Sequence, residues 1–137
     1  MAKLKVFISY DYDHDKEYKN LLLAWNANGV FDFSFYDLSV DIAVDRDDAA
    51  VTRRVISARI NASTYFLCLI GKDTYKSGWV TWEIEKAVEL DKKLVAVKIE
   101  QEQDYTLPPA ILGVGASWAM SFTFDSIKNA IDQEAPT

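Results

Sequence analysis

The chain has 137 residues, of which 50% are hydrophobic and 26% charged, and this size and composition are typical of one globular domain. Its 15 lysines and arginines against 21 aspartates and glutamates give a formal net charge of −6. Such a charge disfavours nonspecific binding to nucleic acid or to an anionic membrane surface.

We expect a single domain over residues 1–137 that ends in a loose tail at residues 133–137. No hydrophobic run approaches the roughly 20 residues of a membrane span, and the first residues lead into a strand rather than a signal-peptide core. The sequence therefore predicts a cytoplasmic protein. Cys68 is the lone cysteine and lies in an apolar run, which favours a buried thiol over a nucleophile. The lone histidine, His14, has no cysteine near it, so a metal site is not expected.

The first part of the chain alternates apolar runs with a helical pattern. Residues 5–9 are predicted to form a buried strand, and residues 16–27 a helix. Residues 31–36 are aromatic and favour a second strand, whereas residues 41–48 are acidic and predict an irregular loop.

A second helix is expected where Val51, Val55 and Ala58 share one face. The most hydrophobic strand follows at residues 65–70 and fits the centre of a sheet that is covered on both faces.

A third helix is predicted to begin at Ser77 and Gly78. Its pattern of apolar residues points Ile84, Ala87 and Val88 into the core.

The last part of the chain predicts two more strands and a helix. Residues 94–99 form a further buried run, and residues 117–122 favour a short last strand. The final helix is expected to start at Thr123 or Asp125 and to carry Ile127 on its apolar face.

Five predicted strands that alternate with helices indicate a parallel sheet with right-handed crossovers. The expected fold is a three-layer α/β domain of the flavodoxin-like class, with a five-stranded parallel sheet in the order 2-1-3-4-5. In such sheets ligands bind outside the carboxyl ends of the strands, where the strand order reverses. This rule selects two loops, residues 9–15 and residues 71–79.

The first loop combines hydroxyls, aromatic rings and carboxylates. Ser9 and Tyr10 leave the strand nearest the expected crevice, and Asp11 follows them. These residues are candidates for ligand binding. The alternative is a solvated acidic turn in which Asp15 caps the first helix.

Glu83 follows the second loop and is flanked by Trp79 and Trp82. It is expected early in the third helix, where the positive end of the helix dipole favours an ionised carboxylate. Trp79 lies four residues earlier and so on the same side of that helix. The alternative is a surface acid that complements the dipole, with the tryptophans as ordinary core residues.

A single carboxylate suits one kind of substitution at a sugar carbon. Ordinary glycosides need a second acid to protonate the leaving group, whereas nicotinamide leaves its ribose as a neutral ring. One anion that stabilises an oxocarbenium-like ribose is then sufficient. The sequence has no Gly-x-Gly-x-x-Gly after a strand, no phosphate-loop lysine, and no Ser-His-Asp or Cys-His arrangement.

Several segments of the chain resemble the TIR domain, and more narrowly the bacterial TIR proteins of the Thoeris antiphage system. These segments are residues 6–10, 37–39, 69–74 and 77–84. The resemblance covers roughly residues 3–112. Its more specific parts are the patterns Ile-Gly-x-x-Thr and Trp-Val-x-x-Glu-Ile.

The resemblance implies that Glu83 is the catalytic residue that cleaves NAD+ at the nicotinamide-ribose bond. The Thoeris members make a cyclic ADP-ribose isomer, which switches on a separate effector during phage infection. NAD+ would then be a substrate and not a permanently bound cofactor. The expected substrate-binding residues are Ser9, Tyr10, Asp11, Asp37, Thr74 and Trp79. Because TIR domains generally complete a site between two subunits, we also expect self-association, and activity that depends on assembly or on a trigger.

Two other functions stay open at this stage. The first is a noncatalytic TIR adaptor that acts through protein-protein contacts. The second is a phosphoacceptor receiver, in which Asp11 and Asp13 would hold Mg²⁺. A receiver also needs an acceptor aspartate at the end of the third strand, where this chain has Gly71 and Lys72, with Asp73 two residues late.

Overall fold

A computed structural model describes residues 4–29, 35–37, 49–100 and 106–134. Within this part of the chain the strands are β1 (Leu4–Ser9), β2 (Phe35–Asp37), β3 (Tyr65–Ile70), β4 (Lys93–Lys98) and β5 (Ser117–Ala119). The helices are α1 (Tyr12–Ala27), α2 (Ala49–Ala62), α3 (Gly78–Glu89) and α4 (Phe124–Glu134), with single turns η1 (Thr74–Lys76) and η2 (Pro109–Ile111).

The described strands form one sheet in the order β2-β1-β3-β4-β5, and every neighbouring pair is parallel. The prediction of an α/β fold with a parallel sheet, consistent with the flavodoxin-like class, is confirmed. The predicted second strand at residues 31–36 overlaps β2 only at Phe35 and Tyr36. Residues 30–34 and the predicted irregular loop at 41–48 lie outside the described residues.

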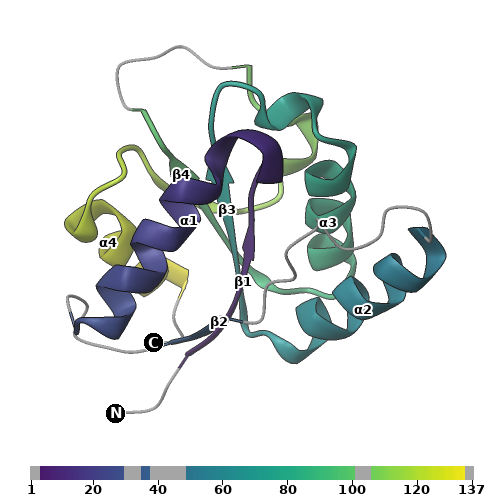
Figure 1. Cartoon of the computed structure of the whole chain (residues 1–137), viewed down its shortest axis with the longest axis horizontal. Helices are drawn as coiled ribbons and strands as arrows, with labels where there is room; N and C mark the ends of the chain where they lie inside the picture. The colour runs from purple at the N-terminus through teal and green to yellow at the C-terminus, as the bar shows by residue number, and fades with distance from the viewer. Residues whose placement is uncertain (1–3, 30–34, 38–48, 101–105, 135–137) are drawn as a thin grey trace.

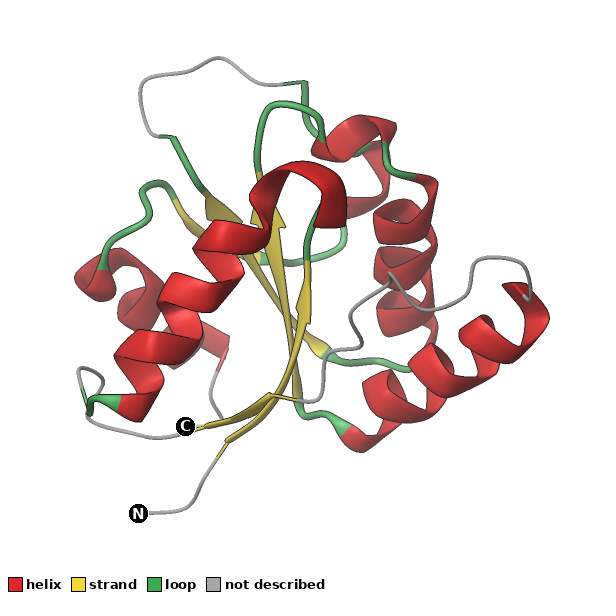
Figure 2. Ribbon diagram, in the orientation of Figure 1, coloured by secondary structure: helices red, strands yellow, loops and turns green. Residues whose placement is uncertain are grey.

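Helices cover both faces of the sheet, so the molecule has three layers (Figures 1 and 2). α1 and α4 lie on one face, and α2 and α3 on the other. Since successive side chains of a strand point to opposite faces, each face has its own core. β3 contributes Leu67 and Leu69 to the core under α1 and α4, and Phe66, Cys68 and Ile70 to the core under α2 and α3.

β3 is buried along its whole length, as predicted for the central strand. On the α2 and α3 side, the ring of Phe66 stacks on that of Phe7 from β1, with 5.6 Å between the ring centroids. This pair packs across the ladder that joins the neighbouring strands β1 and β3.

The predicted helix is confirmed as α2, but the face that Val51, Val55 and Ala58 share is not the buried one. Val51 and Val55 are 42% and 43% exposed, and Ala58 is also exposed. The buried face instead carries Ile56 and Ile60. Both sets of residues have a spacing of four. The helix turns the isoleucines toward the sheet because isoleucine buries more apolar surface than valine or alanine.

The inward face of α3 is only partly as expected. Ile84 and Ala87 are completely buried, whereas Val88 is 41% exposed. One residue further along a helix turns about 100° around its axis, which takes Val88 off the buried face. Glu83 is also buried, which the pattern of apolar residues did not predict.

The final helix is longer than predicted. α4 continues through Gln133 to Glu134, so these two residues are not part of a loose tail, and residues 135–137 lie outside the described residues. The helix is anchored by Ile127 and Ile131, which pack into the core under α1 and α4. Thr123 marks its start, because the Thr123 Oγ1 accepts a hydrogen bond from a backbone amide of the first turn.

Among the helices of the described residues, none combines the length and the apolar character that crossing a membrane would require.

Candidate active site

The candidate site lies at the carboxyl ends of β1 and β3, where α3 begins. Ser77 starts this helix as the sequence predicts: its hydroxyl oxygen accepts a hydrogen bond of 3.2 Å from the backbone amide of Val80. The cap places the first turn of α3 directly after η1. Glu83 therefore lies in the second turn, on the side that faces the sheet.

Glu83 is hydrogen-bonded to Ser9 at the end of β1. The Ser9 hydroxyl donates to Glu83 Oε1 at 2.7 Å, and each residue is only 1% exposed. The two residues are 74 positions apart in the chain. The fold thus brings together two of the predicted site residues in a direct contact.

The protonation state of Glu83 differs from the expectation. Burial raises the pKa of this carboxyl from 4.5 to about 8, and the hydrogen bond from Ser9 lowers it by less. The group is therefore protonated at neutral pH in this conformation, and the predicted ionised carboxylate is wrong. The reason is that desolvation disfavours the charged form more strongly than the start of a helix favours it.

A second buried carboxyl, Asp15, approaches the same edge of the sheet. Thr74 Oγ1 accepts a hydrogen bond of 2.8 Å from the Gly71 amide and donates one of 3.4 Å to Asp15 Oδ2. Thr74 is completely buried. Burial is the main cause that raises the pKa of Asp15 to about 6, and the nearby Asp11 carboxylate adds to it.

Asp15 does not cap the first helix, so the alternative interpretation of this loop is wrong on this point. α1 begins three residues earlier, at Tyr12, and the Asp15 amide donates to the Asp11 carbonyl at 2.8 Å within the first turn. The side chain of Asp15 is then free to turn toward Gly71. The sequence could not predict this position of Asp15, because an acid near the start of a helix is equally typical of a solvated turn.

Asp11 contacts the loop after β3 through a histidine. The His14 Nδ1 lies 2.6 Å from Asp11 Oδ2, and His14 Nε2 lies 3.8 Å from Asp73 Oδ2. The hydrogen bond with Asp11 raises the pKa of His14. No pattern in the sequence indicated this bridging position of His14, because its partners Asp11 and Asp73 lie in two different loops.

Trp79 packs against Trp82 with the two rings nearly perpendicular, at 88° and 6.1 Å between centroids. The guanidinium of Arg53 from α2 lies 5.6 Å from the Trp79 ring and 6.0 Å from the Trp82 ring. Both tryptophans are partly buried. Arg53 was not among the predicted site residues, since nothing in its local sequence links it to these rings.

Two further predicted residues occupy other surroundings. Tyr10 belongs to the core under α1 and α4, and Lys19 Nζ lies 5.2 Å from the centroid of its ring. This is the core on the opposite face of the sheet from Trp79. Asp37 is the last residue of β2 and pairs with Val6 of β1. Its side chain is outside the described part, so the proposed role of Asp37 stays a prediction.

Cys68 lies under the candidate site and is completely buried. Burial raises the pKa of its thiol far above the ordinary value, and the neighbouring Glu83 adds to the effect. The prediction of a buried thiol is therefore confirmed. The described residues contain no group of three or more histidines, cysteines and acids arranged to hold a metal ion.

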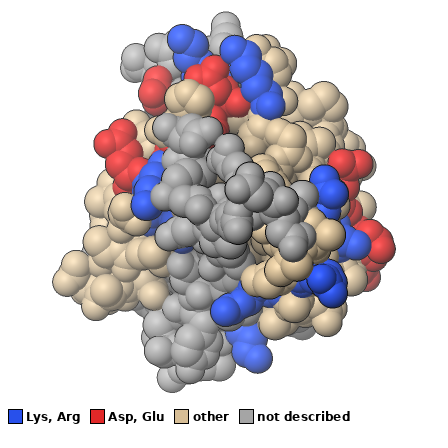
Figure 3. Space-filling view, turned by 45° about the vertical axis from the view of Figure 1, so that its right-hand side comes forward, with Lys and Arg blue, Asp and Glu red and all other residues tan. Residues whose placement is uncertain are grey.

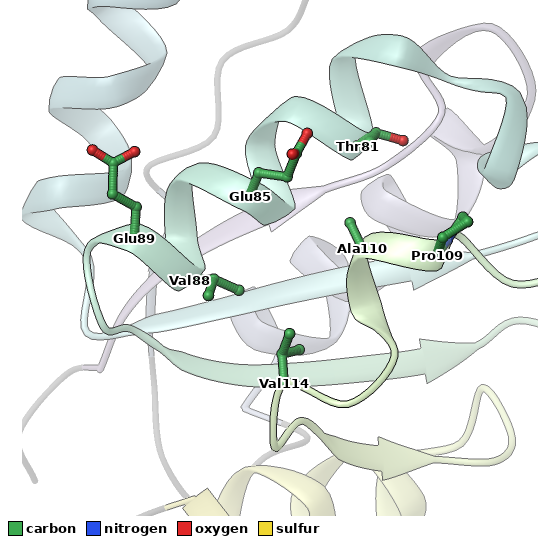
Figure 4. A pocket seen from close by; sticks show the side chains of 7 residues that line it. All are labelled: Thr81, Glu85, Val88, Glu89, Pro109, Ala110 and Val114. Atoms are coloured by element: carbon green, nitrogen blue, oxygen red, sulfur yellow. The ribbon is translucent and has the colours of Figure 1, made fainter.

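An open groove of about 600 Å³ lies on a different side of α3 (Figure 4). Its lining comes from the outward positions of α3 and from the segment around η2: Thr81, Glu85, Val88, Glu89, Pro109, Ala110 and Val114. Glu83 points the other way, into the core. We therefore do not assign this groove to the Glu83 site.

Comparison with known proteins agrees with the motifs and with the fold. The family model described as "Thoeris protein ThsB, TIR-like domain" matches residues 7–104, a range that includes the ends of β1 and β3 and the whole of α3. The chain belongs to this family. The match includes Ser9 and Glu83, the two residues joined at the candidate site.

A similar curated protein comes from Bacillus cereus (strain MSX-D12) and is named "Putative cyclic ADP-D-ribose synthase ThsB1". It is 30% identical over an alignment of 112 residues, and the match covers 76% of this chain and 55% of that protein. The chain thus spans about half the length of this ThsB relative. A conserved protein of solved structure from Enterococcus faecalis V583 is similar in fold, with a TM-score of 0.57 and 15% identity over 75% of this chain and 69% of that chain.

The buried carboxyl predicts how stability depends on pH. Between about pH 4.5 and pH 8 the unfolded chain has released the proton of Glu83 while the folded chain keeps it. Raising the pH in this window therefore favours unfolding, and the free energy of unfolding should fall by roughly a few kcal/mol. Asp15 contributes with the same sign between about pH 3.8 and pH 6. Urea denaturation at a series of pH values measures the effect.

The variant Glu83→Gln removes the titrating group and should flatten this dependence above about pH 6. Glu85→Gln changes an exposed glutamate of the same helix and should keep the wild-type slope. Equal slopes in wild type and Glu83→Gln would show that the carboxyl is not buried in solution.

Proposed function

We propose that this chain cleaves the nicotinamide-ribose bond of NAD+ and forms a cyclic ADP-ribose isomer, with Glu83 as the catalytic carboxylate. The observation that carries the proposal is the buried hydrogen bond between Ser9 and Glu83 at the carboxyl ends of the strands. Membership in the Thoeris TIR-like family and the name of the Bacillus cereus relative support it. NAD+ is the substrate in this proposal and not a bound cofactor.

The chemistry needs a negative charge close to the ribose. The bond from C1′ to nicotinamide breaks with its electron pair going to the ring, which leaves as a neutral molecule, and positive charge builds on the ribose. Ionised Glu83 would stabilise that charge. The new bond to C1′ then comes from a nitrogen or hydroxyl of the same ADP-ribose in place of water, and a proton is released from the attacking group.

A pKa of about 8 makes ionisation of Glu83 inexpensive at neutral pH. Each pKa unit above the ambient pH costs about 1.4 kcal/mol, and the hydrogen bond from Ser9 favours the charged form. The positive charge of the nicotinamide ring lies close to the reacting bond and would lower the pKa further on binding. Substrate binding itself is thus proposed to produce the active carboxylate.

Glu83 is only 1% exposed, so its carboxyl must be uncovered before a ribose can reach it. We propose that self-association or a trigger during phage infection opens the site, and that the cyclic product then activates a separate effector. With the carboxyl buried, we expect the isolated chain to have little activity.

Incubation with NAD+ tests the proposed function. The chain is added to NAD+ alone and together with extract from phage-infected cells, nicotinamide release is followed, and the nucleotide product is analysed by mass spectrometry. We expect a product with the mass of cyclic ADP-ribose in at least one condition. The absence of nicotinamide release in every condition would contradict the proposal.

The closed site also favours a second candidate, a noncatalytic TIR adaptor. In that case Glu83 and Ser9 only hold α3 to β1, and the chain works through its surface. The adaptor predicts stable binding to another TIR protein without consumption of NAD+, whereas the enzyme predicts consumption that ends when Glu83 is replaced. The receiver alternative predicts labelling by a small phosphodonor and is contradicted if no label appears.

A further inference from the structure

Arg53 lies in the corner formed by two perpendicular tryptophan rings beside the candidate site. Its guanidinium is 5.6 Å from the Trp79 centroid and 6.0 Å from the Trp82 centroid. A cation over an aromatic face is attracted to the ring, and contact with two rings restricts where the side chain can go. The Arg53 side chain is nevertheless exposed, so its N–H groups can reach a ligand.

The fold places this corner at the same edge of the sheet as Ser9. Helices of a parallel α/β sheet begin near the carboxyl ends of the strands that precede them. Arg53 is the fifth residue of α2 and Trp79 the second residue of α3, so both lie toward the amino ends of their helices. Trp79 is four residues before Glu83 and is its neighbour along α3. Arg53 therefore contacts a tryptophan that lies one helical turn before Glu83.

A dinucleotide needs a cation at such a position. It carries two negative charges on its diphosphate, and three acids, Asp11, Asp15 and Asp73, lie around the ends of β1 and β3. On the face drawn in Figure 3 the described basic side chains are scattered, and several of them lie beside acidic ones. The cation must therefore act locally.

Arg53 is suited to this task by its surroundings. Within the described residues it forms no ion pair, and its contacts are the faces of the two rings. Lys76 lies at the same edge of the sheet but pairs with Asp73 at 3.5 Å. Arginine also offers N–H groups in a planar fork that fits two phosphate oxygens at once.

We propose that Arg53, held by Trp79 and Trp82, binds the diphosphate of the dinucleotide that reacts at Glu83. This inference rests on the proposed function, and it adds the residue that distinguishes a dinucleotide from a nicotinamide riboside without phosphate. Trp79 in this arrangement positions Arg53.

The test compares Arg53→Ala with Arg54→Ala under a condition in which the wild type releases nicotinamide. Arg54 is the adjacent exposed arginine of α2 and is the matched control. Loss of a charge-assisted contact should raise the KM for NAD+ at least about tenfold in Arg53→Ala, with kcat changed less than about threefold. Arg54→Ala should stay within about twofold of wild type in both constants.

Inhibition constants of two compounds, one with a diphosphate and one without, show whether Arg53→Ala weakens diphosphate binding or disturbs the whole site. The inhibition constant of ADP-ribose should rise with the KM in Arg53→Ala, whereas that of nicotinamide riboside, which has no phosphate, should not change. Arg53→Lys keeps the charge without the planar fork and should give an intermediate KM. Melting temperatures of all variants report any loss of packing against the tryptophans.

Two results would overturn the inference while leaving the proposed function intact. The first is an unchanged KM in Arg53→Ala, which would mean that Arg53 only packs on the tryptophans. The second is an equal rise of both inhibition constants, which would mean that the substitution distorts the whole site. If the wild type releases no nicotinamide in any condition, the proposed function itself fails and the inference falls with it.

Discussion

Replacing Glu83 by glutamine should reduce nicotinamide release from NAD+ at least about a hundredfold while leaving the fold intact. Glutamine has nearly the shape of glutamate, and its carbonyl oxygen can still accept the hydrogen bond that the Ser9 hydroxyl makes at 2.7 Å. It carries no charge at any pH, so it cannot stabilise positive charge on the ribose. Losing a preorganised electrostatic contact of this kind costs about a hundredfold or more in rate.

The measurement is nicotinamide release at saturating NAD+, under the condition that gives the highest wild-type rate. Glu85→Gln is the matched control, because it removes an exposed carboxylate from the same helix, and it should keep the wild-type rate. A Glu83→Gln variant that is folded and fully active would remove Glu83 from the mechanism. A folded variant that is inactive but still binds ADP-ribose would support the catalytic role directly.

Replacing Gly71 by alanine should lower the free energy of unfolding by about 1–3 kcal/mol, the usual cost of forcing extra volume into a packed site. A Cβ on this residue would lie 2.6 and 2.8 Å from the two carboxylate oxygens of Asp15, far inside a normal contact. Asp15 is buried and hydrogen-bonded to Thr74, so it cannot move away without breaking that contact. Urea denaturation measures the loss.

Two further variants identify the cause. Asp15→Ala removes the carboxylate that the new methyl group would meet, so the combined Gly71→Ala and Asp15→Ala variant should be more stable than the sum of the two single effects predicts. Gly78→Ala is the control glycine, since no atom lies within 4 Å of its added Cβ. It should be neutral or stabilising. If Gly71→Ala costs no more than Gly78→Ala, the contact with Asp15 is not tight in solution.

The secondary structure followed from the sequence wherever a local pattern was strong. The run of six apolar residues at β3 and the Ser77-Gly78 start of α3 are signals that neighbouring residues carry by themselves. Together with the rule for ligand sites in parallel sheets, they placed Ser9 and Glu83 at the same edge before any contact between them was known.

Other features depended on how the helices pack against the sheet and against each other. α2 has two sets of apolar residues with helical spacing, and only packing against the sheet shows that Ile56 and Ile60 are buried while Val51 and Val55 are exposed. The position of Arg53 over Trp79 likewise depends on how α2 lies beside α3. Periodicity along one helix contains no information about such a neighbour.

The sequence by itself determined the order of strands and helices, the start of α3, and the presence of one acid beside two tryptophans near the crevice, because all of these depend on local spacing. Only the tertiary structure decided the chemical state of that acid. The charge of Glu83 depends on how much water surrounds it: burial raises its pKa to about 8, although the hydrogen bond from Ser9 favours the charged form. Desolvation arises from residues that are distant in the chain, so it becomes visible only when β1, β3 and α3 are packed together.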